Sequence, residues 1–109
     1  MVVVRDILNS NYALTLEDAC AIHQKVKEAL ENNEKVIVDF AQISCVGSLF
    51  FNESLCKIAK EIGFDIYKTR IETINLDDGP AVVYNATLKM EKKLNNITIE
   101  VNDEYDFDI

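Results

Sequence analysis

The side chains that could carry chemistry lie mostly between Asp39 and Glu53. This stretch holds two hydroxyl groups, on Ser44 and Ser48, and Ser48 follows Gly47 where a helix is expected to begin. A phosphate on Ser48, or less favourably on Ser44, would add about two negative charges beside unsatisfied backbone N–H groups and so create a switch. The alternative is that Ser48 only caps the helix by accepting a hydrogen bond from one of those N–H groups.

Large apolar residues follow the serine directly. Leu49, Phe50 and Phe51 are consecutive, and a helix cannot direct three consecutive side chains into one apolar stripe. At least one of Leu49 and Phe50 should therefore lie off the core face. There it is either an anchor for a protein partner or an ordinary exposed apolar side chain. Asp39 is expected to bond to nearby backbone in the turn or to face the same partner.

The rest of the chain offers little for catalysis or metal binding. His23 is the single histidine, and no recognisable motif connects it with a serine, cysteine or aspartate, so a surface role is expected. Cys20, Cys45 and Cys56 are too scattered to form a zinc site with it. Neither G-x-x-x-x-G-K-S/T nor G-x-G-x-x-G occurs. These absences predict a protein that is not an enzyme and that uses no cofactor and no metal.

Two regular elements are expected to position the stretch from Asp39 to Glu53. Val36–Phe40 is a continuous run of β-branched and aromatic residues around one aspartate, which predicts a central strand covered on both faces. Gly47 is expected to give the backbone freedom to turn. The helix that follows is predicted from apolar residues at spacings of three and four and is expected to end at Gly63.

Further elements are expected on both sides of this unit. Strands are predicted from apolar patterns at Val2–Leu8, Ile71–Ile74 and Ile97–Val101, the last as a half-exposed edge strand. Thr15 is expected to open a helix with Asp18 in a variant of the capping box, and Gly79-Pro80 to open another. The segment Phe64–Thr69 is ambiguous.

This alternation predicts an α/β fold with a small mixed sheet of about four strands and three helices mainly on one face. We expect one domain over residues 1–101, followed by an acidic tail over residues 102–109. The tail is expected to be solvated, or to dock on a basic partner through Tyr105 and Phe107.

Charge and hydropathy narrow the possible partners and location. The net charge is −8, and Glu100, Asp103, Glu104, Asp106 and Asp108 concentrate it near the C-terminus. Because nucleic-acid binding draws on a basic face, DNA and RNA are not expected as partners. No run approaches the roughly 20 apolar residues of a membrane span, and the first residues lack the pattern of a signal peptide. The three scattered cysteines fit reduced thiols, which indicates a cytoplasmic protein.

The motifs around the central strand resemble those of STAS-like domains, relatives of the anti-sigma-factor antagonists of bacteria. The resemblance covers roughly Leu14 to Leu94 and consists of V-I-V-D-F, then Ile43, Gly47-Ser48, Phe50 and Glu53, and finally R-I-E-T-I-N-L from Arg70 to Leu76. It implies a small sheet with helices on one side and a functional turn at the start of the second helix.

The resemblance also implies a regulatory function. In well-known members that turn carries a D-S-S/T-G motif, whose second hydroxyl residue is phosphorylated by an ATP-binding kinase that is also the binding partner. Here Gly47 takes the place of the aspartate and Ser48 that of the first serine, while Leu49 replaces the acceptor and Phe50 the glycine. The resemblance therefore indicates a non-enzymatic module that binds a histidine-kinase-like ATPase, or a factor controlled by one, through this turn.

Two other functions remain open from the sequence. One is a homo-oligomeric scaffold, a dimer for example, in which the expected strand Ile97–Val101 pairs between chains. The other is a domain that binds a small ligand or nucleotide at the strand-to-helix turn.

Overall fold

The computed structural model describes the backbone of residues 1–105 and the side chains of residues 1–94. It shows one sheet of three strands in the order β1-β3-β5 and one of two strands, β2-β4, and all neighbouring strands are parallel. The strands are β1 (Val2–Val3), β2 (Tyr12–Ala13), β3 (Val36–Asp39), β4 (Cys45–Val46) and β5 (Ile71–Ile74). The α/β class is confirmed, but the single mixed sheet of about four strands is wrong. The strands that pair are separated by helices, so each returns in the same direction as its partner.

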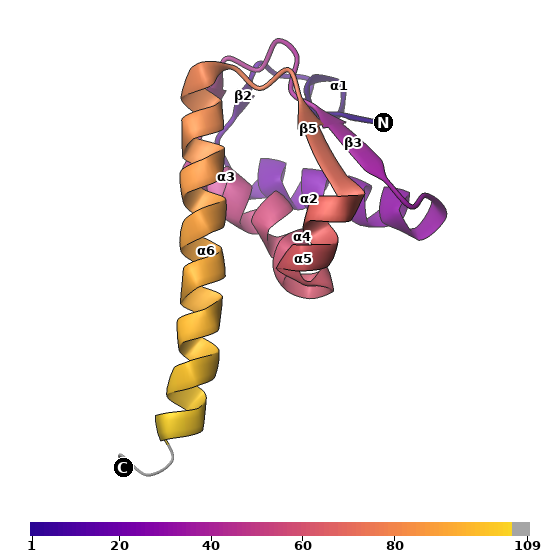
Figure 1. Cartoon of the computed structure of the whole chain (residues 1–109). Coiled ribbons are helices and arrows are strands. Elements are labelled where there is room, and N and C mark those ends of the chain that lie inside the picture. Colours follow the sequence, from indigo (N-terminus) through magenta and orange to yellow (C-terminus); the bar gives the residue numbers. More distant parts are fainter. Residues whose placement is uncertain (106–109) are drawn as a thin grey trace.

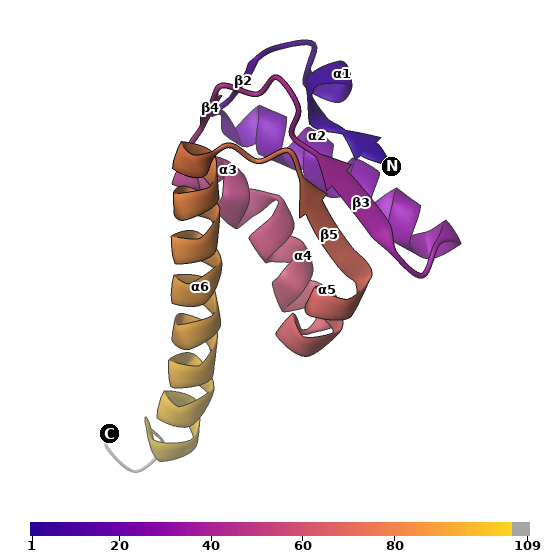
Figure 2. The ribbon, with the colours of Figure 1, turned by 45° about the horizontal axis from the view of Figure 1, so that its top comes forward.

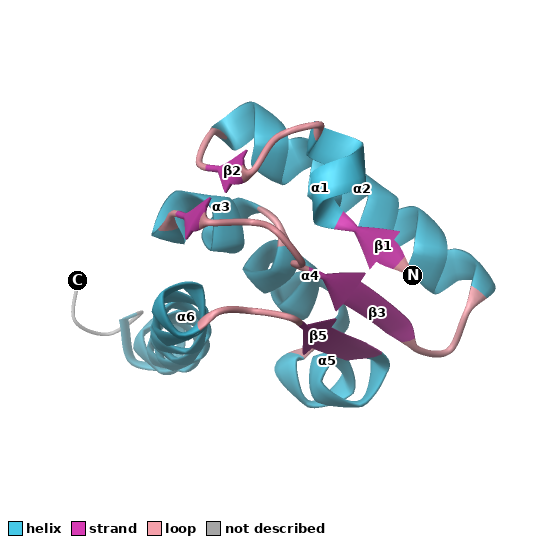
Figure 3. Ribbon diagram, turned by 90° about the horizontal axis from the view of Figure 1, so that it is seen from above, coloured by secondary structure: helices cyan, strands magenta, loops and turns pink. Residues whose placement is uncertain are grey.

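The three-stranded sheet has helices behind one face. Figure 3 shows α2 (Leu16–Asn32), α4 (Leu55–Ile62) and α5 (Phe64–Arg70) behind β1-β3-β5, with no described helix in front. Val36 and Val38 of β3 are buried, whereas Ile37 and Asp39 are only half-buried. The central position of this strand is therefore confirmed. Its expected burial on both faces is wrong, because the alternate side chains point to the face without helices.

Of two predictions made for the N-terminal region, the structure confirms one and contradicts the other. Thr15 caps α2 as expected, since its hydroxyl accepts a hydrogen bond of 3.0 Å from the Asp18 backbone N–H. The predicted strand Val2–Leu8 keeps only β1, and Val4–Leu8 forms the short helix α1. The pair Arg5-Asp6, both exposed, interrupts the alternation that a strand needs. Asn9 then ends α1 in the left-handed conformation, which asparagine tolerates.

The helix expected after Gly47 is divided at Ser54 into α3 (Ser48–Glu53) and α4. Ser54 is buried and leaves helical geometry at φ −119° and ψ −90°. Its hydroxyl donates a hydrogen bond of 2.6 Å to the Phe50 carbonyl oxygen. Gly63 ends α4 as predicted, with a φ of +97° that most residues avoid. The ambiguous segment then forms α5, and the predicted strand Ile71–Ile74 is confirmed as β5.

The last helix, α6 (Asp78–Tyr105), is longer than expected. It begins two residues before Pro80 and runs through Ile97–Val101, so the predicted edge strand is wrong. No glycine or proline follows Pro80 in the sequence, and nothing therefore stops a helix that Ala86, Leu88 and their neighbours favour. The expected tail is backbone helix up to Tyr105, and residues 106–109 lie outside the described part. Figures 1 and 2 show α6 beside α3, with its C-terminal end projecting beyond the body.

Candidate functional site at the start of α3

An aromatic cluster holds the inner side of α3 against the rest of the core. Phe50 and Phe51 are fully buried, and both rings contact the ring of Phe40 next to β3, at centroid distances of 6.4 and 5.9 Å. Tyr84 of α6 packs on Phe51 at 5.1 Å. These edge-on and tilted contacts fix the position of the helix start relative to β3 and α6.

Asp39 has a structural position at the end of β3. One of its carboxylate oxygens accepts hydrogen bonds of 2.9 Å from the Ala41 backbone N–H and from the Asn75 side-chain amide. Because Asn75 follows β5, this carboxylate ties together the ends of two neighbouring strands. Of the two roles expected for Asp39, bonding within the turn is the one that these contacts display.

Gly47 precedes α3 in an extended conformation, with φ −97° and ψ 160°. Any residue can adopt this conformation, so the expectation that the turn uses the conformational freedom of a glycine is wrong. Its N–H donates a hydrogen bond of 3.2 Å to the Ala13 carbonyl oxygen of β2. A Cβ atom at this position would lie 3.5 Å from Leu14 Cδ2, an ordinary contact distance.

Ser48 is the first residue of α3, not the cap, and its side chain is exposed. Its hydroxyl forms no hydrogen bond with the residues that the structure describes. Ser44 is also exposed, but its hydroxyl donates a hydrogen bond of 3.3 Å to the Asn11 carbonyl oxygen, and its N–H donates another of 2.9 Å to the same atom. Of the two candidate acceptors, Ser48 is therefore the freer hydroxyl.

Leu49 and Phe50 differ in exposure, as the geometry of a helix requires for consecutive residues. Leu49 is 48% exposed, and Phe50 is 0% exposed. The inclusion of Phe50 among the partner-binding residues is therefore wrong for this structure, because its ring belongs to the core. Leu49 is the apolar residue that lies off the core face. Glu53, at the end of α3, is half-buried.

Sequence reasoning missed two exposed apolar residues beside the strand-to-helix turn. Tyr12 is 58% exposed and Leu14 is 45% exposed. Figure 2 shows β2 and β4 near the start of α3. The pairing of these strands places Tyr12 opposite Cys45, and Leu14 lies against Gly47. We call Tyr12, Leu14 and Leu49 the apolar rim. Leu14 and Leu16 flank Thr15 in the sequence. This pair of large apolar residues around a helix cap was the available signal of an exposed apolar surface.

A hollow of about 310 Å³ lies on the other flank of Ser48, against α6. Its lining residues are Ser48, Asn52, Ala86, Thr87, Met90 and Glu91. The amide oxygen of Asn52 is buried there without a hydrogen-bond partner among the described residues, an arrangement that native proteins usually avoid. Glu91 is occupied by an ion pair of 2.7 Å with Lys60.

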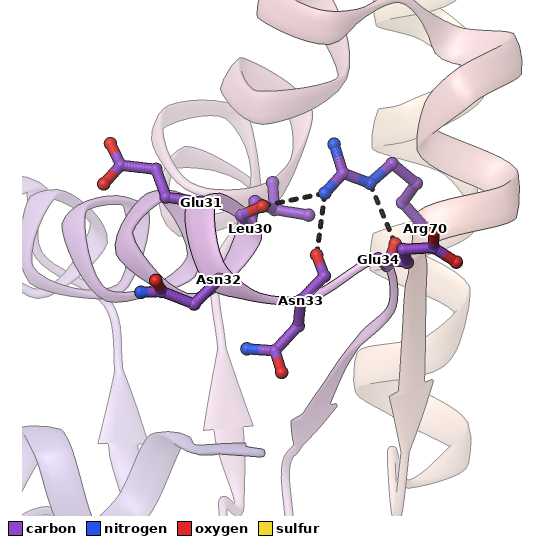
Figure 4. A pocket seen from close by; sticks show the side chains of 6 residues that line it. All are labelled: Leu30, Glu31, Asn32, Asn33, Glu34 and Arg70. Carbon is purple, nitrogen blue, oxygen red and sulfur yellow. Dashed lines mark hydrogen bonds between the residues drawn. The ribbon is translucent and has the colours of Figure 1, made fainter.

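A second hollow, of about 270 Å³, is lined by the end of α2 and Arg70. Figure 4 shows the Arg70 guanidinium directed at the last carbonyl groups of that helix. It donates hydrogen bonds of 2.7 to 2.8 Å to the carbonyl oxygens of Leu30, Asn33 and Glu34. A cation that satisfies the end of a helix in this way stabilises the fold. These hydrogen bonds give Arg70 a structural role at the end of α2.

Other reactive groups do not form a further site. His23 of α2 contacts Glu61 of α4 at 2.9 Å. Burial, with a smaller contribution from Glu91, raises the pKa of the Cys56 thiol from 9.0 to about 12, so this thiol stays protonated and unreactive. Within residues 1–94 no group of three or more histidine, cysteine or acidic residues is arranged for a metal ion. No described helix combines the length and the apolar character that crossing a membrane requires.

Comparison with known proteins identifies the family. No curated protein and no solved structure matches this chain. Residues 18–79, more than half of the chain, match a family described as a STAS-like domain of unknown function (DUF4325). The matched segment contains β3, the start of α3 and β5, which are the elements that carry the resemblance found in the sequence. The chain therefore belongs to this STAS-like family.

Proposed function

We propose that this STAS-like domain is a non-enzymatic regulatory module that binds a protein partner through the outer side of α3. The observation that carries the proposal is the apolar rim, three large apolar side chains that remain about half exposed beside the strand-to-helix turn. Apolar side chains gathered on a surface gain free energy when a partner removes them from water. Large side chains of this kind commonly form the centre of a protein interface.

By resemblance, the partner is a histidine-kinase-like ATPase or a protein controlled by one. The family match includes the strand-to-helix turn, which in related anti-sigma-factor antagonists is the contact region. The rigid aromatic cluster behind the turn supports the proposal, since a surface that is fixed before binding costs less entropy to dock.

Phosphorylation of Ser48 is the proposed switch. The hydroxyl is exposed, and Leu49 occupies the acceptor position of the family motif, so Ser48 is the nearest alternative. A phosphate there would bring about two negative charges next to Leu49 and to Glu91 across the hollow, and it would weaken an apolar contact. Competition between partners without phosphorylation is the other way to regulate the same surface.

The test uses an ATPase that copurifies with the full chain. Its affinity is measured by calorimetry for the wild type, for Leu49→Asp and for Ile66→Asp, a control residue of α5 that is equally exposed but lies outside the rim. We expect Leu49→Asp to lose at least about tenfold in affinity and Ile66→Asp to bind normally. Incubation with ATP should yield either a phosphopeptide that contains Ser48 or a stable complex. Absence of both, or equal losses in the two variants, would contradict the proposal.

The structure does not support the homo-oligomeric scaffold in the form that the sequence suggested. It required an edge strand at Ile97–Val101, and this segment belongs to α6.

A further inference from the structure

A small pocket between α5 and α6 has an apolar floor and a positively charged border. It encloses about 260 Å³ and is lined by Phe64, Tyr67, Lys68, Leu88, Lys89 and Lys92. The Tyr67 hydroxyl is already hydrogen-bonded to the Tyr84 hydroxyl, at 2.7 Å. The floor therefore offers ring and aliphatic surface, and the charge comes from the three lysines alone.

Three lysines gather at this pocket although the protein has a net charge of −8. Lys35 and Lys60 each form an ion pair, with Glu72 at 2.9 Å and with Glu91 at 2.7 Å. None of the three pocket lysines forms an ion pair with a described carboxylate, and no acidic residue lines the pocket. Three cations around an apolar floor select an anionic group that also carries an apolar side chain.

The size of the pocket indicates what kind of group can enter. Pockets for cofactors and other small molecules usually enclose about 300–1,000 Å³. A volume of about 260 Å³ is below that range, and it suits one or two side chains of a peptide better than a whole metabolite.

The chain itself contains a segment with the matching chemistry. In residues 104–109, Glu-Tyr-Asp-Phe-Asp-Ile, acidic side chains alternate with aromatic or aliphatic ones, and Asp103 precedes them. We propose that the pocket between α5 and α6 binds this acidic, aromatic segment from a second copy of the chain. Phe107 or Tyr105 would occupy the apolar floor, and the adjacent aspartates would pair with Lys68, Lys89 and Lys92.

The segment cannot come from the same copy while α6 is intact. Lys92 and Tyr105 are both in α6, and at 1.5 Å per residue they lie about 20 Å apart along its axis. Phe107 follows Tyr105 by two residues, which span at most about 7 Å. It cannot return to its own pocket, but two copies can exchange their segments reciprocally. This pocket shares no residue with the apolar rim, so the exchange and the proposed partner binding stand or fall separately.

Sedimentation of the full chain over a range of concentrations tests the exchange. We expect a dimer that dissociates with rising salt concentration. Lys89→Glu/Lys92→Glu and Phe107→Ser should each weaken the association at least about tenfold. Lys57→Glu is the matched control, since Lys57 is an exposed lysine of α4 outside the pocket. Phe107→Ser changes the segment and leaves every lining residue of the pocket intact, so it separates a lost contact from a defect in the fold of the pocket.

A charge-swap experiment makes the test specific. Lys89→Glu/Lys92→Glu and Asp106→Lys/Asp108→Lys should each remain monomeric alone, because pocket and segment then carry like charges. An equal mixture should form a heterodimer in which both pocket–segment pairs are again complementary. The proposal would be overturned by a wild-type chain that stays monomeric, by a dimer that the pocket variants do not weaken, or by a mixture that does not associate. Binding of a synthetic peptide of residues 102–109 to a monomeric chain would instead assign the pocket to an acidic segment of another protein.

Discussion

Phe50 and Phe51 lie on the inner side of α3, whereas Ser48 and Leu49, directly before them, lie on the outer side. The inner pair belongs to an aromatic cluster with Phe40 and Tyr84, and the outer pair faces solvent beside other exposed apolar residues. The difference teaches that one turn of helix can separate side chains that stabilise the fold from side chains that are exposed and could contact a partner. If this is correct, inner substitutions should change the free energy of unfolding, and outer ones should change only binding.

The largest effect is expected for Phe51→Ala on the inner side. The ring is fully buried between three other aromatic rings, so its removal leaves a cavity and costs about 3–5 kcal/mol of unfolding free energy. Urea denaturation followed by circular dichroism measures this loss. Leu49→Ala is the matched control and should change the free energy by less than about 0.5 kcal/mol. Similar losses in the two variants would erase the distinction between the two sides.

A smaller and gradual loss of stability is expected as the pH becomes alkaline. Burial raises the pKa of Cys56 to about 12 and also raises those of Tyr67 and Tyr84, so these groups ionise more readily in the unfolded chain than in the folded one. The stability that they contribute is complete below about pH 9 and is lost as the pH rises through their folded-state pKa values. Melting temperatures measured from pH 8 to pH 11.5 should therefore fall.

Two cysteine variants test the cause of this pH dependence. Cys56→Ala should flatten the alkaline part of the curve, whereas Cys45→Ala, which replaces an exposed thiol, should leave its shape unchanged. An identical fall in both variants would show that the interior thiol does not contribute.

Ser54→Ala tests the break between α3 and α4. The substitution removes the donor to the Phe50 carbonyl oxygen, and we expect a loss of about 1 kcal/mol. Thermal unfolding of Ser54→Ala and Ser54→Thr distinguishes the lost hydrogen bond from a simple change in volume, because threonine keeps the hydroxyl. A more stable Ser54→Ala variant would mean that α3 and α4 prefer to be one continuous helix.

The smallest change in stability is expected for Ser48→Asp on the outer side. The side chain is exposed and has no described hydrogen bond to lose, so the unfolding free energy should change by less than about 0.5 kcal/mol. The affinity of the Ser48→Asp variant for the partner, in contrast, should fall if phosphorylation is the switch. Ser44→Asp provides the comparison, and a greater effect on binding at that position would move the switch to the other hydroxyl.

Much of the fold was predictable because its signals are local. Thr15 as a cap, Gly63 as a helix end, and the strands around Val38 and Thr73 each depend on a few neighbouring residues. The segment Ile97–Val101 was mispredicted because its alternating pattern was interpreted in isolation, whereas the helix that precedes it continues through the segment. Ser54 was missed as a break since its effect depends on burial, which no local pattern encodes.

The candidate site was predictable only in part. The exposure of Ser48 and the departure of one large residue from the core follow from helix geometry. Which of Leu49 and Phe50 faces outward depends on the rotation of α3, and that rotation is set by the aromatic cluster. Tyr12 and Leu14 reach the site only through the pairing of β2 with β4, a contact between segments far apart in the chain.

The parallel pairing of every described strand has a consequence for how the chain folds. Val2 pairs with Val38 and Val36 with Ile71, so each sheet contact closes a loop of about 35 residues, and no hairpin can form a first nucleus. Early structure must then come from helical segments such as α2, with the strands joining afterwards. On the ribosome, the first strand would wait unpaired until β3 has been synthesised.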